Sequence, residues 1–366
     1  MNILIIGEFS GFAKHLKNGF QQLGHNVVNV HTGDSWKKIS DVSDVIYSYK
    51  HWYILGCKIP GSSKLCNIIT NIKLDRLIKR RCPNPDIIVV INFSFLRKNI
   101  TWAGVSRSMI VDYASRGAKI IMSECGDGCA LAYRHKEYYK MMGRKLSLHD
   151  KRYDFLLKYS HIIIPTIFMY YDQLIAYDEI HPYDTSKVSK PIPLPITIEK
   201  EEPQKTCVGR KIVIFHGIIR PIAKGTPFIK EAMERIEREL PDKVECVCVG
   251  GLPYDEYLKV FNRVDILIDQ TYGNGWGMNA AIGAMKGKCV LAPCGSENGE
   301  IMGIPNIPFV QIGPDSEMIY QRLKDLVLNP EKIDAIKEDS RRFAEEYCDC
   351  RIIAGRYLKV LDNLNH

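Results

Sequence analysis

Hydrophobic and polar positions alternate along the first half of the chain in short blocks typical of strands and helices. Asn2–Ile6 is a continuous apolar run, a glycine-bearing turn follows it, and Phe12–Leu23 has apolar residues at helical spacing. Val27–Val30 then predicts a second strand. A strand, a helix and a strand in this order predict a parallel sheet covered on both faces. Further strands are predicted at Asp44–Tyr47, Asp86–Ile91, Lys119–Met122 and His161–Pro165, and helices at Asn67–Arg81 and Thr101–Arg116.

The pattern breaks near residue 190 and then starts again. Ser189–Pro195 is rich in proline and cannot be a regular helix, and Glu199–Lys205 is charged without a hydrophobic period, so we predict a linker there. Beyond it, strands are predicted at Lys211–Phe215, Val244–Val249, Asp265–Ile268 and Cys289–Ala292, and helices at Thr226–Leu240, Tyr254–Arg263, Met278–Lys286, Ser316–Leu328 and from Pro330 to the end. Two such halves indicate two Rossmann-like α/β domains in tandem, facing across a cleft that holds the working site.

Composition agrees with a globular protein of two domains. The chain has 366 residues, of which 46% are hydrophobic and 25% charged, so neither a disordered nor a fibrous protein is indicated. Its net charge of +8 suits a partner that carries phosphate or a lipid surface, although many enzymes share it; we expect no nucleic-acid partner. The N-terminus lacks the features of a signal peptide, and no stretch approaches the roughly 18 apolar residues of a membrane span, so we expect a cytoplasmic protein.

Twelve cysteines raise the question of disulfides or a zinc site. Their spacings, such as Cys125-x3-Cys129, Cys246-x-Cys248 and Cys289-x4-Cys294, include no paired C-x2-C units. Several lie in apolar, strand-like runs, where cysteine behaves as a small hydrophobic residue. We therefore predict reduced, buried thiols and no metal.

The loops after the strands decide function, because ligands of such sheets bind outside the carboxyl ends of the strands. The loop His216–Thr226 follows a strand and opens a helix, and it places Arg220 and Lys224 beside backbone N–H groups. A guanidinium, an ammonium and a helix N-terminus together favour a diphosphate site. The alternative is a solvated basic loop.

Two more loops of the second half carry candidate ligand contacts. Asp269–Asn279 has three glycines within five residues, which let a ligand approach the backbone closely, although a tight loop without a ligand has the same pattern. Pro293–Glu300 carries two glutamates that can accept hydrogen bonds from sugar hydroxyls, although acids in a turn are more often simply solvated. No GxGxxG follows the first strand, which disfavours a nicotinamide oxidoreductase.

Taken in order, these motifs resemble the retaining GT-B glycosyltransferases of family 4. The resemblance rests on the Gly217, Arg220 and Lys224-Gly225 pattern, on Gly275–Met278 and on Ala284–Val290, supported by the Leu23–Val27 segment near the start. It implies a GT-B fold with an acceptor-side domain at 1–195, a donor domain at 196–349 and a helix at 350–366 that returns to the first domain. It also implies transfer of a hexose from a nucleotide-diphosphate sugar, a UDP-sugar rather than a GDP-sugar, with retention and without a metal or cofactor.

The resemblance assigns roles to individual residues. Arg220 and Lys224 would stabilise the charge of the leaving diphosphate. Glu124 and Asp127, after the strand Lys119–Met122, would orient the hydroxyl of a glycan or lipid-linked acceptor, or else belong to a solvated turn. Such an enzyme would serve surface polysaccharide or glycolipid synthesis. The predicted donor-binding residues are Gly217, Asn274, Gly275, Trp276, Gly277, Met278, Asn279, Gly11, Phe12 and Glu297.

The sequence departs from the family pattern at its paired glutamates. Without a gap, the two positions of E-x7-E fall on Asn274 and Ile282, and Gly283 takes the second place only if the loop is one residue longer. The separation between Arg220 and Lys224 is also one residue shorter than usual. A non-catalytic GT-B-like binding protein is therefore the alternative to an enzyme.

A basic helical segment suggests a further partner. Residues 71–81 carry Leu74, Leu77 and Ile78 at helical spacing, with basic residues between them. Such a helix can lie on the anionic cytoplasmic face of a membrane. The alternative is a core-facing helix with a charged outer face. The basic residues are Lys73, Arg76, Lys79, Arg80 and Arg81.

Overall fold

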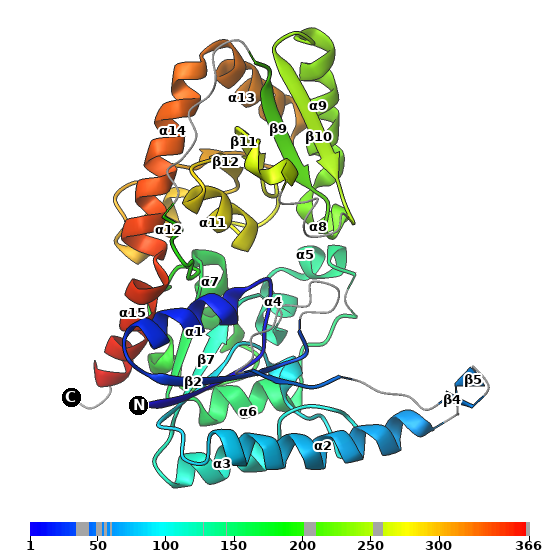
Figure 1. Ribbon diagram of the computed structural model, residues 1–366, viewed down its shortest axis with the longest axis vertical. Helices are drawn as coiled ribbons and strands as arrows, with labels where there is room; N and C mark the ends of the chain where they lie inside the picture. Colours follow the sequence, from blue (N-terminus) through cyan, green and yellow to red (C-terminus); the bar gives the residue numbers. More distant parts are fainter. Residues whose placement is uncertain are drawn as a thin grey trace.

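Two parallel β-sheets form the centres of the two halves of the chain (Figure 1). The computed structural model describes residues 1–33, 44–48, 53–54, 57–58, 61–126, 128–143, 145–200, 210–251 and 259–363. The first sheet has six strands in the order β3-β2-β1-β6-β7-β8, all paired in parallel. Its strands are β1 (Asn2–Ile6), β2 (Asn26–His31), β3 (Val45–Ile46), β6 (Ile87–Val90), β7 (Lys119–Glu124) and β8 (Ile162–Pro165).

The second sheet has five strands in the order β10-β9-β11-β12-β13, also parallel throughout. They are β9 (Ile212–Gly217), β10 (Val244–Val249), β11 (Ile266–Ile268), β12 (Cys289–Ala292) and β13 (Val310–Gln311). A separate antiparallel pair, β4 (Tyr53–Ile54) and β5 (Cys57–Lys58), precedes the second helix.

Helices cover both faces of each sheet. In the first half they are α1 (Phe12–Gln22), α2 (Ser62–Arg81), α3 (Arg107–Ser115), α4 (Cys129–Arg134), α5 (Lys136–Met141), α6 (Lys151–Tyr159) and α7 (Phe168–Tyr177), with 3-10 turns at Phe93–Phe95 and Thr185–Lys187. In the second half they are α8 (Pro221–Lys224), α9 (Thr226–Glu239), α11 (Met278–Met285), α12 (Ser296–Met302), α13 (Ser316–Leu328) and α14 (Pro330–Phe343), followed by a π-turn at Ala344–Cys348 and by α15 (Cys350–Asp362).

Side chains that alternate along the strands belong to three hydrophobic cores. In β1, Ile3 and Ile5 enter one core while Leu4 and Ile6 enter another, as expected for a strand buried on both faces. In β9, Val213 and Phe215 join the same core as Ile3 and Ile5. That core is therefore shared by one face of each sheet and joins the two halves.

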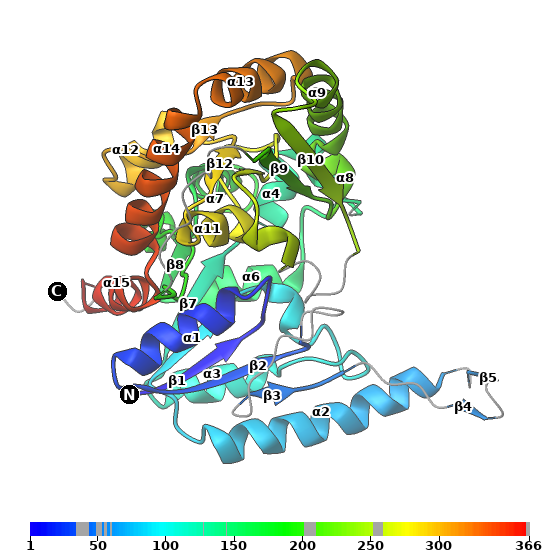
Figure 2. The same ribbon diagram turned by 45° about the horizontal axis from the view of Figure 1, so that its top comes forward.

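The chain passes between the halves twice, and the two passages are hydrogen-bonded to each other. The Ile196 N–H donates to the carbonyl of Cys348 at 2.7 Å, and the Cys350 N–H donates to the carbonyl of Ile196 at 2.8 Å. Helix α15 then packs along α1, back in the first half (Figure 2). A Cβ on Gly19 of α1 would lie 1.9 Å from the Cys350 carbonyl oxygen, so this close approach requires glycine.

Most predicted elements are confirmed. The ten predicted strands are all present, with ends within two residues of those expected, and the last helix, α15, packs along α1 of the first half. Ten cysteines of the described ranges are unpaired thiols, and burial raises the pKa of several, Cys289 to about 12. Part of the predicted helix Tyr254–Arg263 lies outside the described residues.

Two local predictions were wrong. The helix expected at Thr101–Arg116 begins at Arg107, because Leu96 and Val105 pair in a short bridge and the segment between them forms a loop. The segment after β12, expected as a loop, winds into α12 from Ser296. The short edge strand β13 was not predicted.

Candidate functional site

The carboxyl ends of the two sheets face one another, and the loops after the strands meet between them. The Phe168 N–H, after β8 in the first half, donates to Asn298 Oδ1 in the second half at 3.0 Å. Gly275, in the loop after β11, has φ +147°, and a Cβ there would lie 2.5 Å from Ile167 Cδ1. In the second sheet, β10 is added on one side of β9 and β11 on the other, so the strand order reverses between β9 and β11; ligands of doubly wound sheets bind at such a point.

Lys224 ties together the two loops at this switch point. Its Nζ donates to Asp269 Oδ1 at 2.5 Å and to the Asp269 carbonyl at 3.1 Å. The other carboxylate oxygen of Asp269 accepts from the Gly277 N–H at 3.0 Å. Burial alone would raise the pKa of Asp269, but the charge and hydrogen bond of Lys224 and the Gly277 N–H lower it on balance.

His216 joins the same two loops, since its imidazole contacts Ile268 before one loop and Thr226 at the end of the other. Its Nδ1 lies 2.9 Å from the Ile268 carbonyl and must carry the proton, which leaves Nε2 to accept from the Thr226 hydroxyl at 2.8 Å. Burial lowers the pKa of His216 to about 4, with a smaller contribution from the charge of Lys224. The imidazole is therefore neutral at physiological pH and fixes β11 against the start of α9.

Arg220 is the exposed cation of the predicted donor loop. It precedes α8 with φ +57°, and its guanidinium lies 3.6 Å from the sulfur of Met142 in the first half. Within the described ranges, only Ser10 and Arg220 are non-glycine residues with positive φ, and each follows the first strand, in chain order, of its sheet, β1 and β9 respectively. Backbone strain of this kind gathers at functional sites.

Gly217, also predicted for the donor, is the last residue of β9.

The glycine-rich loop after β11 is shaped largely by protein contacts. Gly275 makes room for Ile167, and Gly277 approaches the Asp269 carboxylate. Trp276 is buried and packs edge-on against Phe309 and Phe343. The side chain of Trp276 therefore offers little surface to a ligand.

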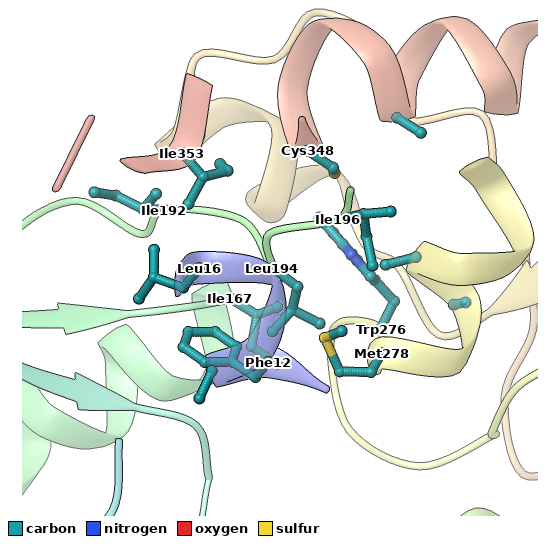
Figure 3. Packing of buried hydrophobic residues seen from close by; sticks show 14 of the residues in the cluster. Phe12, Leu16, Ile167, Ile192, Leu194, Ile196, Trp276, Met278, Cys348 and Ile353 are labelled. Carbon is teal, nitrogen blue, oxygen red and sulfur yellow. The ribbon is translucent and has the colours of Figure 1, made fainter. Parts of the chain in front are cut away.

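Phe12 and Met278, predicted at the donor, also lie in the shared core. Both are at least nine-tenths buried. Figure 3 shows Met278 and Trp276 on one side of this core and Phe12 on the other, with Leu194 and Ile196 between the halves. Asn279, in the first turn of α11, is half-buried and remains closer to solvent than its neighbour Met278.

Asn274 stands where the first family glutamate is expected, and it is engaged by its own neighbours. Its Oδ1 accepts from the Gly295 N–H at 2.8 Å and from Asn298 Nδ2 at 2.9 Å, and its Nδ2 lies 3.2 Å from Glu297 Oε2. Glu297 is thus the acid nearest this position. A hollow of about 510 Å³ lies beside α12 and is lined by ten residues between Cys294 and Ile307, but neither Arg220 nor Lys224 contributes to it.

The second glutamate position has no replacement. Ile282 packs against the shared core. Gly283 faces the sheet, where a Cβ would lie 2.4 Å from Leu267 Cδ2, so a longer side chain has no room there.

In the first half, Glu124 is buried at the end of β7. It accepts from the Tyr153 hydroxyl at 3.0 Å and from the Gly126 N–H at 3.0 Å. Burial, followed by the charge of Glu124, raises the pKa of Tyr153 well above its usual range, so Tyr153 remains a donor. Asp127 lies outside the described residues.

Gly11 has φ +91° and precedes α1, whose first N–H groups are already capped. The Glu8 carboxylate accepts from the Gly11 N–H and from the Lys14 N–H, both at 2.9 Å. Glu8 is buried, so a negative charge of the protein itself occupies this helix terminus. The roles of Glu8 and Asp269 were not predicted from the sequence, where the only signal for them is an acid placed directly after a buried strand.

Helix α2 agrees with the second of the two predictions for this segment, a core-facing helix with charged residues on its outer side. Leu74 and Ile78 are buried in the core of the first half and Leu77 packs against it, so they offer no apolar face to a membrane. Arg81 donates to the Asp44 carbonyl at 3.1 Å. Lys73, Arg76, Lys79 and Arg80 are exposed.

One cluster of possible metal ligands occurs in the described part of the chain. The ligand atoms of His149, Asp154 and His181 lie within 4.8 Å of one another, away from the loops described above. His181 and Asp154 are 3.6 Å apart, as in an ordinary ion pair. Within the described ranges, no helix combines the length and the apolar content needed to cross a bilayer.

The sequence matches no family model and no curated protein. Solved structures, however, align over almost the whole chain. A glycosyltransferase from Rickettsia africae is 14% identical with a TM-score of 0.57, the alignment covering 99% of this chain and 98% of that one. The sucrose-phosphate synthase of Thermosynechococcus elongatus is 13% identical over the same shares, with a TM-score of 0.61. The HepE protein of Anabaena, solved in complex with UDP, is 12% identical over 99% of this chain and 100% of that one, with a TM-score of 0.61.

These similarities confirm the predicted fold class, a GT-B architecture of two facing α/β halves. At such low sequence identity, the similarity to these structures is evidence for the fold alone.

Proposed function

We propose that the chain transfers a hexose, with retention, from a nucleotide-diphosphate sugar to a glycan or lipid-linked acceptor. The observation that carries this proposal is the exposed Arg220 guanidinium where the two halves meet, in the loop after β9 and 3.6 Å from Met142 of the other half. A UDP-sugar is the preferred donor, and the UDP complex of HepE, a protein of the same fold, supports this choice. We place the enzyme in the cytoplasm, in surface polysaccharide or glycolipid synthesis.

In the proposed reaction, the bond between the sugar C1 and the diphosphate oxygen breaks while the acceptor oxygen bonds to C1 on the same face. The acceptor proton passes to the departing phosphate. Arg220 stabilises the charge that develops on the diphosphate. Lys224 assists through its third ammonium hydrogen, because the other two are directed to Asp269. No metal ion is required.

The first half would bind the acceptor near the end of β7. Glu124 is held by Tyr153 and Gly126, so it would act by keeping this loop in position rather than by free movement. Asn274 and Glu297 would contact sugar hydroxyls from the donor side, sharing the hydrogen bonds that now join their loops.

The second candidate function is that of a GT-B-like binding protein without catalysis. It is favoured by one observation: the side chains at Asn274, Ile282 and Gly283 provide no carboxylate where the family pattern has two. Nucleotide binding alone does not separate the two candidates, whereas turnover does.

The test is calorimetric titration of the purified protein with UDP and GDP, followed by assays of UDP-hexose hydrolysis and transfer. The proposal expects UDP to bind more tightly than GDP, slow release of UDP from a UDP-hexose, and loss of about tenfold or more in UDP affinity for Arg220→Gln, since one charge-assisted contact contributes about 1.5–3 kcal/mol. Binding without any turnover would favour the second candidate. Absence of nucleotide binding would refute both the donor site and the transferase.

A further inference from the structure

Helix α2 presents a second apolar stripe to solvent, on the side opposite its buried residues. Leu65, Ile69 and Ile72 are between 38% and 48% exposed, and their spacing of four and three residues places them on one face. Leu74 and Ile78, on the other side of the helix, are buried in the core. One apolar side of α2 is thus covered by the fold, and the other is not.

The exposed stripe is followed along α2 by a group of basic side chains. Arg76 follows Ile72 on the same helical face, and Lys73, Lys79 and Arg80 flank it, all of them exposed. No ion pair in the described part of the chain involves any of these four residues. The C-terminal half of α2 therefore carries four positive charges beside an apolar surface.

A neighbouring loop enlarges the apolar surface and is firmly attached to α2. Ile100 and Trp102 are 66% and 45% exposed. The Asn71 side chain of α2 donates to the carbonyls of both residues, at 2.9 and 3.1 Å. Arg97 of the same loop pairs with Asp75 of α2 at 2.8 Å. The two exposed side chains are therefore held close to α2.

We infer that this face, here called the α2 surface, binds an anionic lipid bilayer. The apolar side chains enter the boundary between headgroups and acyl chains, and the cations contact lipid phosphates. Trp102 suits this boundary because its side chain carries a large apolar ring. The α2 surface consists of Leu65, Ile69, Ile72, Ile100 and Trp102 with Lys73, Arg76, Lys79 and Arg80.

The position and charge of the α2 surface favour a membrane over a second copy of this chain. A symmetric dimer through α2 would bring four cations of each copy together, whereas anionic lipids neutralise them. Helix α2 runs along the edge of the first half farthest from the second half (Figures 1 and 2). A bilayer beneath it would leave the donor loops facing water, so this inference goes beyond the proposed transfer reaction and does not depend on it.

Flotation with vesicles of phosphatidylcholine, alone or mixed with phosphatidylglycerol, tests this inference in low and high salt. The full-length protein should bind the mixed vesicles and not the neutral ones. The double variant Arg76→Gln/Lys79→Gln should bind about thirtyfold more weakly in low salt, because each cation at a membrane surface contributes about fivefold. Ile72→Ser/Trp102→Ser should lose the binding that remains in high salt.

Matched controls lie on the second half. Lys230→Gln/Arg238→Gln removes two exposed cations of α9, and Leu328→Ser removes an exposed apolar side chain of α13; both should bind vesicles as the wild type does. Melting temperatures should stay unchanged, since all these side chains are at the surface.

Three outcomes would overturn the inference: no binding to the mixed vesicles, equal binding to neutral and anionic vesicles, or equal binding by the α2 variants and the controls. A dimer in light scattering that Ile72→Ser/Trp102→Ser converts to a monomer would instead assign the α2 surface to self-association. UDP titrations of the same variants should match the wild type, so failure of membrane binding and failure of the donor site can be told apart.

Discussion

At the scale of single residues, the two cations of the donor loop differ in their surroundings. Arg220 is exposed, whereas the Lys224 ammonium is paired with an aspartate that has no contact with solvent. A buried carboxylate that loses its partner is strongly destabilising, because its charge remains uncompensated. Lys224 must therefore contribute to folding as well as to any ligand contact.

We expect Lys224→Met to lower the free energy of unfolding by about 3–5 kcal/mol, because it leaves the Asp269 carboxylate buried and unpaired. Adding Asp269→Asn should recover a large part of this loss, since a neutral amide can still accept from the Gly277 N–H. Urea unfolding of the four proteins of this double-mutant cycle measures the coupling. Additive effects of the two substitutions would contradict the pairing.

The buried histidines make stability depend on pH. Burial lowers the pKa of His216 and of His15 to about 4, against an ordinary value near 6.5. Between these values the unfolded chain binds more protons than the folded one. The stabilisation is therefore complete above about pH 6.5 and is lost as the pH falls towards 4, by up to about 3 kcal/mol for each residue.

His216→Gln tests this dependence directly. The variant should be less stable than the wild type at pH 7.5, because its new side chain cannot reproduce both imidazole hydrogen bonds. It should, however, lose less stability between pH 6.5 and pH 5, since one titrating group is gone. Urea unfolding across this range gives both quantities, and parallel curves for the two proteins would refute the assignment to His216.

The sequence predicted which loops matter but not which partners their side chains have. Arg220 and Lys224 stand out because basic residues beside glycine after a strand are a recognisable pattern. Asp269 does not stand out, because its role depends on a contact 45 residues away that no local pattern encodes. The same holds for Glu8, whose carboxylate caps α1.

At the scale of elements, the contact between α1 and α15 depends on a single missing side chain. We expect Gly19→Ala to lower the free energy of unfolding by about 1–3 kcal/mol, because its Cβ would overlap the Cys350 carbonyl at 1.9 Å and force the helices apart. Gly355→Ala is the matched control on α15, where a Cβ meets nothing within 4 Å. There alanine should be neutral or stabilise by up to about 1 kcal/mol. Thermal unfolding of the two variants measures this difference in stability. Equal changes in stability would contradict the close approach of α1 and α15 at Gly19.

The strands were predictable because their pattern is local and strong. Runs such as Asn2–Ile6 are apolar at every position, which is typical of a parallel sheet buried on both faces. The loop of residues 96–105 was not predictable, since it is held by α2 side chains such as Asn71, more than 25 residues earlier in the chain. Helix α12 was missed because its sequence contains glycine and no apolar period.

At the scale of the whole molecule, the halves are joined more closely than the sequence suggested. Linker composition predicted a boundary, but the passages at Ile196 and Cys348–Cys350 are hydrogen-bonded and buried. Several residues expected to line the cleft, among them Phe12 and Trp276, instead complete the shared core. Of the predicted donor contacts, the polar loop residues around Arg220 and Lys224 are therefore the ones that remain outside this core.

This shared core predicts that the two halves unfold together. Because one hydrophobic core draws residues from both sheets and from α15, unfolding either half would expose apolar surface of the other. Scanning calorimetry should show a single transition whose calorimetric and van't Hoff enthalpies agree, and UDP should shift it as a whole. Ile196→Ala, which opens a cavity at the passage between the halves, should cost about 2–5 kcal/mol and split the transition or broaden it. Two separate transitions in the wild-type protein would mean that the halves are stable independently and that the core between them contributes little.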